Sequence, residues 1–279
     1  MSPSLVVEFT KMHGAGNDFL VLDNRWYRFS DDELADRAAT WCPRRYGVGA
    51  DGLLALAEAE ADDVDYRMRY VNADGSWATM CGNGARCLAR FALDADFEGP
   101  ELTFETDAGR YHATVDEDRP DVVRLYVPAP REQELDVALE GSPPFDPEAI
   151  HYVDTGTGHL VVFVSDVEAV PVSEWAPPLR ADARVDPPGA NVNFVEVDVG
   201  RLRVRTFEKG VEAETPSCGT GVLAAASIAE ATDRLGPDPV TIDTAGGTFR
   251  VGRASTRRGR ERYLEGPVVT VFRGSLTVT

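Results

Sequence analysis

Lysine is almost absent from this sequence of 279 residues: only Lys11 and Lys209 occur, and arginine supplies the rest of the 28 basic side chains. Aspartate and glutamate number 47, so the formal net charge is −19 at pH 7. Such an anionic surface repels phosphate backbones, and we therefore expect no nucleic-acid partner. The acidic residues are spread along the whole chain, which favours a halophilic-like acidic surface, screened by high salt, over an ordinary acidic protein.

Long apolar segments are missing as well. The longest run made only of large aliphatic and aromatic residues is Leu160–Val164, far below the roughly 20 residues that cross a bilayer as a helix. Residues 1–9 have neither the basic start nor the apolar stretch of a secretory signal. We therefore expect a cytoplasmic protein with no membrane partner.

Signatures of cofactors are scarce. Cysteine occurs four times without a C-x-x-C pair, and the histidines are scattered at positions 13, 112, 151 and 159, so no metal site is predicted. Two lysines give little opportunity for a pyridoxal Schiff base. The string Gly47-x-Gly49-x-x-Gly52 lacks the preceding strand that a dinucleotide fingerprint requires. The sequence thus predicts no cofactor.

What the sequence does contain is a series of short alternating segments. They predict strands at 6–9, 65–71, 110–115, 122–127, 202–207, 248–251 and 268–272. Ser30-Asp31-Asp32-Glu33 is a capping box that predicts a helix to about residue 40, and two further helices are expected at about 83–93 and 220–232. Many strands and few helices without regular alternation indicate an α+β fold. The stretch 127–147, rich in Pro, Gly and acids, is the best candidate for a domain junction.

An internal repeat divides the chain. In the first copy a predicted strand ends at Asn72, and after a loop Cys81-Gly82-Asn83-Gly84 opens a helix. In the second copy the strand ends at Glu208, and Cys218-Gly219-Thr220-Gly221 opens a helix. The two cysteines lie about half the chain apart. The repeat predicts two similar halves with one such cysteine each and an active site in the cleft between them.

Both cysteines are expected at helix N-termini, where the positive end of the helix dipole stabilises a thiolate. The glycines allow a ligand to approach closely, and the free N–H groups suit a carboxylate. One cysteine as thiolate would remove a proton from an α-carbon while the other, as thiol, delivers one to the opposite face, which inverts a stereocentre. The helix termini would stabilise the developing charge, so no cofactor is needed.

The cysteines have simpler interpretations too. Free cysteines are mostly buried, and we expect Cys42 and Cys87 to be packing residues. A disulfide between Cys81 and Cys218 is expected as an oxidation product rather than as a native link.

Four motifs, at 11–19, 72–76, 81–87 and 214–221, resemble those of the diaminopimelate epimerase family. The resemblance extends from Phe9 to the last strand, with the motifs in the same order and spacing. It implies a pyridoxal-independent epimerase of lysine biosynthesis that converts LL- to meso-diaminopimelate, a small-molecule amino acid substrate. It also implies a homodimer and two pseudo-symmetric α+β halves, each a curled, mostly antiparallel sheet around a central helix. We expect residues 1–127 plus 268–279 to form the half with Cys81, and residues 128–267 the half with Cys218.

By position, the resemblance makes Cys81 and Cys218 the acid and the base, with His159 and Glu208 assisting near the reacting centre. It assigns substrate binding to Asn17, Asn72, Gly82, Asn83, Asn191, Glu208, Lys209, Gly219 and Thr220.

Three positions depart from the family. Thr157 replaces an amide that is frequent there, Lys209 replaces a frequent arginine, and Gly52 replaces a frequent glutamine. An ammonium is a point charge, whereas a guanidinium holds a carboxylate by a two-pronged fork. These positions concern the distal end of the substrate, so the chemistry carries over more safely than the substrate does.

Two other functions stay open at this point. A proline-racemase-like enzyme shares the fold and a cysteine pair, but the motifs at 14–19 and 72–75 favour the epimerase. A thiol redox protein would use Cys81 and Cys218 as an exchanging pair, which usually occurs as C-x-x-C. Proton exchange at an amino acid α-carbon separates the three functions.

Overall fold

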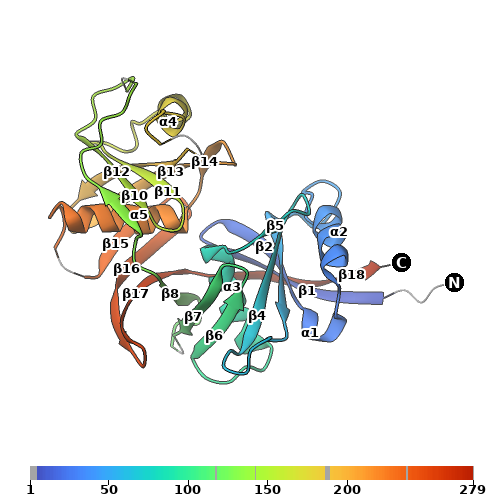
Figure 1. Ribbon diagram of the computed structural model, residues 1–279. Coiled ribbons are helices and arrows are strands. Elements are labelled where there is room, and N and C mark those ends of the chain that lie inside the picture. The colour runs from blue at the N-terminus through green and yellow to red at the C-terminus, as the bar shows by residue number, and fades with distance from the viewer. Residues whose placement is uncertain (1–4, 117, 142, 186–188, 237, 279) are drawn as a thin grey trace. The chain divides into compact units, whose positions relative to one another are not determined.

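The computed structural model describes residues 5–116, 118–141, 143–185, 189–236 and 238–278. The chain divides into two compact units, Met1–Tyr126 with Gly266–Thr279, and Val127–Glu265. We call them the first half and the second half (Figure 1). None of the helices that the structure describes combines the length and the apolar character that crossing a membrane requires.

The first half begins with two strands and two helices and closes with the last strand of the chain. Its elements are β1 (Leu5–Gly14), β2 (Asn17–Asp23), α1 (Asn24–Tyr27), α2 (Asp31–Trp41), β3 (Gly52–Ala57), β4 (Tyr66–Asn72), β5 (Trp77–Ala78), α3 (Gly82–Asp94), β6 (Glu101–Thr106), β7 (Gly109–Val115), β8 (Val122–Val127) and β18 (Val269–Val278).

The second half repeats this arrangement after a short additional strand. Its elements are β9 (Glu132–Glu134), β10 (Ala149–Asp154), β11 (Gly158–Phe163), α4 (Val172–Arg180), β12 (Asn191–Asp198), β13 (Arg201–Glu208), β14 (Ala213–Thr215), α5 (Gly219–Ala231), β15 (Val240–Thr244), β16 (Gly247–Thr256) and β17 (Gly259–Pro267).

The two halves share one pattern of strand pairing. In the first half β1–β2 is antiparallel, β2–β3 parallel, β3–β4 antiparallel and β4–β6 parallel, and β6–β7 and β7–β8 are antiparallel. The second half has the same succession along β10–β11–β12–β13–β15–β16–β17. The expected α+β fold with two repeated, mostly antiparallel halves is confirmed.

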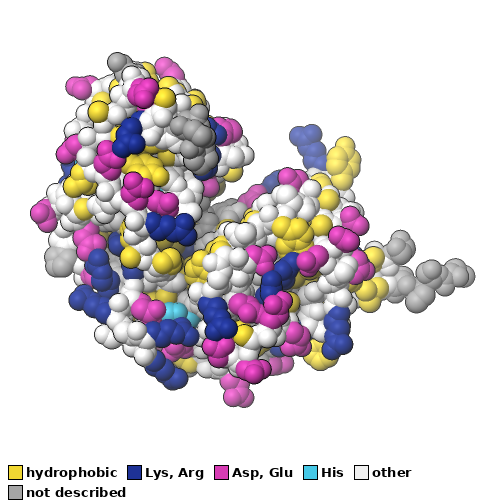
Figure 2. Space-filling view, in the orientation of Figure 1, with side chains coloured by type: hydrophobic (Ala, Val, Ile, Leu, Met, Phe, Trp, Pro, Cys, Tyr) yellow, Lys and Arg dark blue, Asp and Glu magenta, His cyan; other side chains and the backbone are white. Residues whose placement is uncertain are grey.

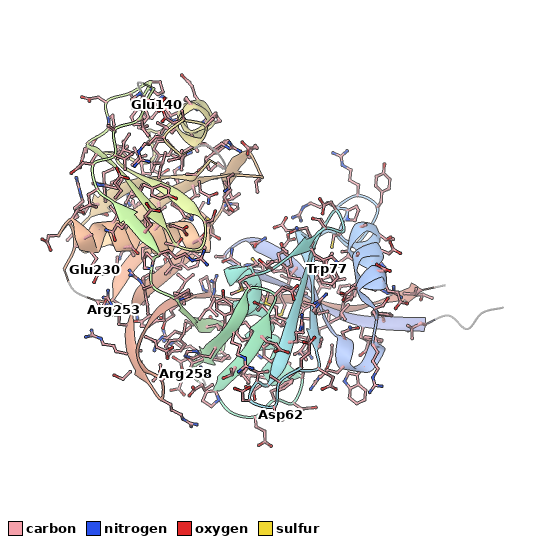
Figure 3. All side chains as sticks on the ribbon, in the orientation of Figure 1. Asp62, Trp77, Glu140, Glu230, Arg253 and Arg258 are labelled. Carbon is pink, nitrogen blue, oxygen red and sulfur yellow. The ribbon has the colours of Figure 1, made fainter. Side chains whose placement is uncertain are left out.

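In each half the strands are wrapped around one central helix. Helix α3 contacts β1, β2, β3, β4 and β7, and α5 contacts β10, β11, β12, β13, β15 and β16. Every residue of α5 from Gly221 to Ala229 is buried, as expected of a helix that strands enclose. At the other end of α5, Glu230 forms a bidentate ion pair with Arg253 of β16, with N–O distances of 2.7 and 3.0 Å (Figure 3).

The opposite face of each sheet carries a second apolar core. In the first half α2 covers it with Leu34, Ala38 and Trp41, and in the second half α4 covers it with Val172, Ala176 and Leu179. Because strand side chains alternate between faces, the residues between these core positions face the central helix. Acidic side chains are spread over the surface of both halves in the view of Figure 2.

Most of the predicted elements are confirmed. Helix α2 begins after the capping box, in which Ser30 accepts from the Glu33 N–H at 3.3 Å and the Glu33 carboxylate accepts from the Ser30 N–H at 2.9 Å. Helices α3 and α5 begin directly after Cys81 and Cys218. Strands β4 and β13 end at Asn72 and Glu208, as expected.

Candidate active site

Cys81 is the N-cap residue of α3. Its backbone is extended, with φ −141° and ψ 119°, so its side chain lies beside the first turn of the helix. The Sγ atom accepts a hydrogen bond from the Gly84 N–H at 3.5 Å. A backbone N–H that points at sulfur, together with the positive end of the helix dipole, favours the thiolate.

Asn17 and Asn83 complete the surroundings of Cys81. The Cys81 Sγ lies 3.6 Å from Asn17 Oδ1, and the Asn83 amide donates to the same oxygen at 3.4 Å. The structure therefore brings together three of the residues that the sequence assigned to the site, and Gly82 lies in the same turn. The Asn17 oxygen is placed to accept from a thiol, whereas the Gly84 N–H is placed to stabilise a thiolate.

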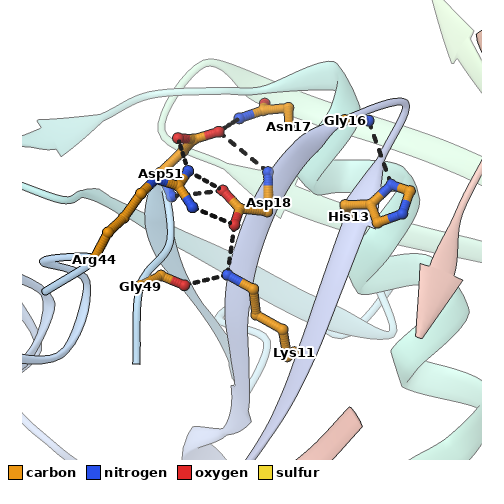
Figure 4. A network of polar contacts seen from close by, with 8 residues as sticks. All are labelled: Lys11, His13, Gly16, Asn17, Asp18, Arg44, Gly49 and Asp51. Carbon is orange, nitrogen blue, oxygen red and sulfur yellow. Dashed lines mark hydrogen bonds and ion pairs between the residues drawn. The ribbon is translucent and has the colours of Figure 1, made fainter. Parts of the chain in front are cut away.

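A network of charges holds Asn17 in this orientation (Figure 4). The Asn17 amide N–H donates to Asp51 at 2.7 Å, which turns its oxygen toward Cys81. Arg44 bridges Asp51 and Asp18, with N–O distances of 2.8 and 2.7 Å. Burial opposes ionisation of Asp18, but hydrogen bonds and charges from Arg44 and Lys11 outweigh it and hold the Asp18 pKa well below its usual range. This network was not predicted, although Lys11, Asn17 and Asp18 all lie in the motif at 11–19.

Asn72 and Gly52 lie opposite each other on β4 and β3. The Asn72 amide donates to Ser76 Oγ at 3.0 Å, within its own turn. A Cβ atom at position 52 would lie 2.6 Å from the Tyr70 ring and 2.6 Å from the Val71 carbonyl oxygen. At position 52, where the family often carries a glutamine, the Tyr70 ring thus occupies the place that a side chain would need.

Arg86 is a second residue that sequence reasoning missed. It is fully buried in α3 and donates to Asn83 Oδ1 at 2.6 Å and to the Gly82 carbonyl at 3.2 Å. Burial lowers its pKa to about 10, and the neighbouring Cys87 and Cys81 oppose that shift. Its signal was an arginine on an otherwise apolar stretch of helix, inside the cysteine motif. It fixes the Asn83 amide, because a guanidinium only donates.

Cys218 is the N-cap residue of α5 and has the same backbone conformation, with φ −121° and ψ 112°. Its surroundings differ, since Sγ lies 3.4 Å from the Thr220 hydroxyl. The Thr155 hydroxyl donates to the Thr220 carbonyl at 3.1 Å and so fastens the first turn of α5 to the loop after β10. Gly219 and Thr220 form the start of α5 directly after Cys218.

His159 and Asn191 lie opposite each other on β11 and β12. The Asn193 amide nitrogen is 3.1 Å from His159 Nδ1, and the Asn191 amide nitrogen is 3.5 Å from Nε2. The Lys209 backbone N–H donates to Asn191 Oδ1 at 2.9 Å. His159 is completely buried, and burial together with the positive charge of Lys209 lowers its pKa to about 3. The imidazole is therefore neutral at physiological pH.

Glu208 and Lys209 follow at the end of β13. The Glu208 carboxylate accepts from the Thr215 hydroxyl on the neighbouring strand β14. Thr157, in the turn before β11, accepts through its carbonyl from the Thr155 N–H at 3.1 Å. It stands two residues before His159, in the place that Asn17 occupies before Phe19 in the first half. The amide that the family often carries there is absent from this half.

The remaining two cysteines are packing residues, as expected. Cys42 and Cys87 are buried, and burial raises the pKa of Cys42 to about 12 and that of Cys87 still further. Both are free thiols, as are Cys81 and Cys218. Within the described residues, no group of three or more His, Cys, Asp or Glu side chains is arranged to hold a metal ion.

The sequence is similar to known epimerases along nearly its full length. Residues 9–129 and 151–271 match the family model described as diaminopimelate epimerase. A diaminopimelate epimerase of Methanothrix thermoacetophila is 40% identical over 275 residues, covering 96% of this chain and 95% of that protein. One from Aquifex aeolicus is 36% identical over 280 residues, covering 97% and 98%.

Solved structures share the fold at low sequence identity. A phenazine biosynthesis protein of the PhzF family from Bacillus anthracis has a TM-score of 0.74 at 16% identity, covering 98% of this chain and all of that one. A hydroxyproline epimerase from Agrobacterium vitis has a TM-score of 0.68 at 17% identity, covering 98% and 93%. At such identities these similarities concern the fold alone.

Proposed function

The chain belongs to the diaminopimelate epimerase family, and from this premise we propose that it interconverts LL- and meso-diaminopimelate in lysine biosynthesis by proton transfer between Cys81 and Cys218. The observation that carries the proposal is the repeated geometry. In both halves a cysteine with extended backbone caps a buried central helix. An enzyme with a single nucleophile, or a cysteine that only fills the core, would not require this arrangement in both halves.

The reaction begins with one cysteine as thiolate and the other as thiol. The thiolate takes the proton from the α-carbon, and the thiol gives its proton to the opposite face of the resulting carbanion. Each turnover thus exchanges the protonation states of Cys81 and Cys218, and the reverse reaction or exchange with water restores them. The amino acid neither gains nor loses atoms, and its configuration at that carbon inverts.

The carboxylate next to the reacting carbon binds at the helix N-termini. Negative charge moves onto this carboxylate as the proton leaves, and backbone N–H groups at Gly82, Asn83, Gly219 and Thr220 point outward from the first turns of α3 and α5. These donors are fixed before the reaction, so they stabilise the carbanion without reorganising. This electrostatic role is the one that a pyridoxal ring fills in other racemases, and no cofactor is needed.

His159 and Glu208 assist in different ways. A histidine whose pKa is about 3 cannot supply a proton at neutral pH, so His159 acts as a neutral hydrogen-bonding group. The Glu208 carboxylate, held by Thr215, suits the ammonium group of the substrate. Asn17, Asn72 and Asn191 line the substrate, and its distal end is left to Lys209.

A homodimer is the assembly that we propose. Strands β1 and β18 pair with each other and carry exposed apolar side chains, among them Val6, Val271 and Phe272 at 54, 52 and 45% exposure. Such side chains on terminal strands are suited to burial against a second copy. Sedimentation of the wild type and of a Val271→Asp variant tests this, since the variant should sediment as a monomer.

The decisive experiment follows hydrogen at the α-carbon. LL-diaminopimelate incubated with the protein in heavy water should be converted to the meso form with deuterium at the inverted carbon. L-proline under the same conditions should gain no label. Labelled proline would indicate a racemase of the proline type, and exchange of thiols without any carbon-bound label would indicate a redox protein.

A further inference from the structure

Asn193 lies beneath the first turn of α5, and both its amide nitrogen and its amide oxygen are engaged in polar contacts. Its amide nitrogen donates to the Leu160 carbonyl at 2.9 Å and contacts His159 Nδ1 at 3.1 Å. Its oxygen accepts from the Thr206 hydroxyl at 2.9 Å. A backbone carbonyl only accepts, so the atom that faces Leu160 must be the NH₂ group, and the orientation of the amide is determined.

This orientation determines which nitrogen of His159 carries the proton. With one N–H directed at Leu160, the other N–H of Asn193 points at Nδ1, which must therefore accept. The proton of the neutral ring then resides on Nε2. An imidazolium would direct an N–H at the amide N–H of Asn193, which is unfavourable in a buried site.

Asn191 makes a competing but longer contact with the other ring nitrogen, and its amide nitrogen also faces an acceptor of its own, the Gly158 carbonyl, at 3.4 Å. Its amide is oriented by Lys209, whose backbone N–H it accepts at 2.9 Å, so its nitrogen faces Nε2 at 3.5 Å. A neutral imidazole accepts at one nitrogen only, and the contact at 3.1 Å is the closer one. The Nε2–H of His159 and the Asn191 amide are thus two adjacent donors, which an oxygen of a bound substrate can satisfy together.

Asn193 also supports the helix that carries Cys218. A Cβ atom at Gly221 would lie 2.3 Å from Asn193 Oδ1, so α5 rests on this amide only because residue 221 is glycine. In the first half the matching Gly84 lies against Leu54, which pairs with Val21 and Tyr70 as Asn193 pairs with Val161 and Thr206. Since Leu54 is sufficient to support α3, support of α5 alone does not explain why position 193 carries an amide.

We propose that Asn193 is a positioning residue of the epimerase: it holds His159 as the neutral Nε2–H tautomer, so that this N–H is a donor toward the substrate. The inference rests on the proposed function, because His159 is placed beside the reacting centre only by that proposal. Asn193 itself contacts His159 and the helix, and it acts through them.

The tautomer is measured directly. In long-range ¹H–¹⁵N spectra of the wild-type protein labelled in its histidines, we expect His159 to show a protonated Nε2 and an unprotonated Nδ1, with a His159→Gln variant identifying its signals. In Asn193→Asp a carboxylate oxygen faces Nδ1 and requires a proton there, so the tautomer should reverse and the His159 pKa should rise. A protonated Nδ1 in the wild type, or an unchanged pattern in Asn193→Asp, would overturn the proposal.

Two matched variants separate this role from simple packing. Asn193→Leu copies the first half and keeps the number and branching of the side-chain heavy atoms but removes the donor, so His159 should show a mixture of tautomers while the protein stays folded. Thr206→Val removes only the hydroxyl that donates to Asn193 Oδ1, so the tautomer should remain as in the wild type. If Asn193→Leu kept a single Nε2–H tautomer, Asn193 would have no positioning role, and this variant decides the matter even where Asn193→Asp does not fold.

Kinetics complete the test. We expect Asn193→Asp to lower kcat for LL-diaminopimelate by about a hundredfold with little change in KM, as for the loss of a donor that acts in the transition state. We also expect the pH profile of kcat for this variant to show one additional ionisation. An unchanged kcat with a reversed tautomer would show that the Nε2–H does not matter for the reaction. Wild-type turnover of diaminopimelate reports on the proposed function independently, since the spectra need no substrate.

Discussion

The two halves have the same strand order but present different surfaces to their central helices. Helix α3 faces Phe19, Leu54 and Tyr70, whereas the matching positions facing α5 hold His159, Asn193 and Thr206. The apolar set only supports its helix, while the polar set forms a hydrogen-bonded chain beneath it. Duplication of the fold therefore explains where the two cysteines lie, and divergence of the residues beneath them makes their surroundings unequal.

The two halves also differ in the charged side chains near their cysteines. In the first half Arg86 is buried one turn beyond Cys81, and a network of Lys11, Asp18, Arg44 and Asp51 holds Asn17. In the second half the residue matching Arg86 is Leu223, and the hydrogen-bonded chain beneath α5 is neutral. The first half thus orients its amide by fixed charges, and the second by neutral amides and a hydroxyl.

The largest effect is expected from the cysteines, where the halves are most alike. Cys81→Ser and Cys218→Ser should each lower epimerisation by about 10²–10⁴-fold, because a hydroxyl is far too weak an acid to exchange protons with an α-carbon. Steady-state assays with LL-diaminopimelate measure this. If either variant kept more than about a tenth of wild-type turnover, a mechanism with two cysteines would be wrong.

The other two thiols provide the control. Cys42→Ala and Cys87→Ala should retain turnover, since both side chains are buried and burial raises their pKa values. Each should lose some stability through the cavity that it leaves. Inactive but folded control variants would mean that loss of activity does not identify the acid and the base.

A smaller effect is expected from the charge network that only the first half possesses. Asp51→Ala removes the acceptor that orients the Asn17 amide at 2.7 Å, and it should lower kcat/KM by about tenfold, the worth of one hydrogen bond to a charged group. The control is Asp63→Ala, which breaks the exposed ion pair with Arg110 in the same half. Equal activity of the two variants would remove Asp51 from the site.

The difference between the halves also explains what the sequence could and could not predict. The cysteine turns, the capping box and strands such as 122–127 follow local rules, and the structure confirms them. Helix α4 was missed because Pro177 and Pro178 lie inside it, where proline normally ends a helix. Local rules describe a residue and its neighbours in the chain, so they suffice for elements.

The polar residues around the cysteines could not be found in this way. Asn193 and Thr206 act together because β12 and β13 pair in one particular register, and a shift of β13 by one residue would turn Thr206 to the other face of the sheet. Asp51 likewise acquires its role only from Asn17, a partner distant in the chain. Asn17, by contrast, was identified because its motif resembles that of a known family.

Acid should separate the halves by stability. The unfolded histidine binds a proton below its ordinary pKa of about 6.5, while buried His159 does so only near 3. Between these pH values the unfolded state binds more protons than the folded state. The free energy of unfolding therefore decreases by about 1.4 kcal/mol for each unit by which the pH is lowered, for one such group. Asp18 in the first half has a lowered pKa, so its contribution persists until about pH 4 and is lost below that.

Hydrogen exchange resolved by peptide tests this difference. As pH is lowered from 7 to 5, and after correction for intrinsic rates, peptides of the second half should lose protection first. His151 also has a lowered pKa through burial, so His159→Gln should reduce the second half's sensitivity to acid without abolishing it. Equal loss of protection in both halves would mean that His159 is not buried in its neutral form.

The smallest effect is expected at Lys209, which distinguishes the ends of the two equivalent strands. Asn72 and Glu208 match, and the next residues are Ala73 in the first half and Lys209 in the second. The second half therefore has a lysine directly after its strand end, and we expect this lysine to hold the distal carboxylate. Lys209→Ala should raise KM several-fold, by about 1 kcal/mol or less, with a smaller fall in kcat, because a point charge on a flexible stem contributes modestly to binding. Lys209→Arg should preserve or tighten binding, since a guanidinium holds a carboxylate by two hydrogen bonds.

Ala73→Lys is the matched control: a cation introduced at the first half's strand end should not rescue Lys209→Ala if the substrate binds in one direction. An unchanged KM in Lys209→Ala would mean that the distal carboxylate is bound elsewhere, and rescue by Ala73→Lys would mean that the two halves are interchangeable for binding although their central helices rest on different residues.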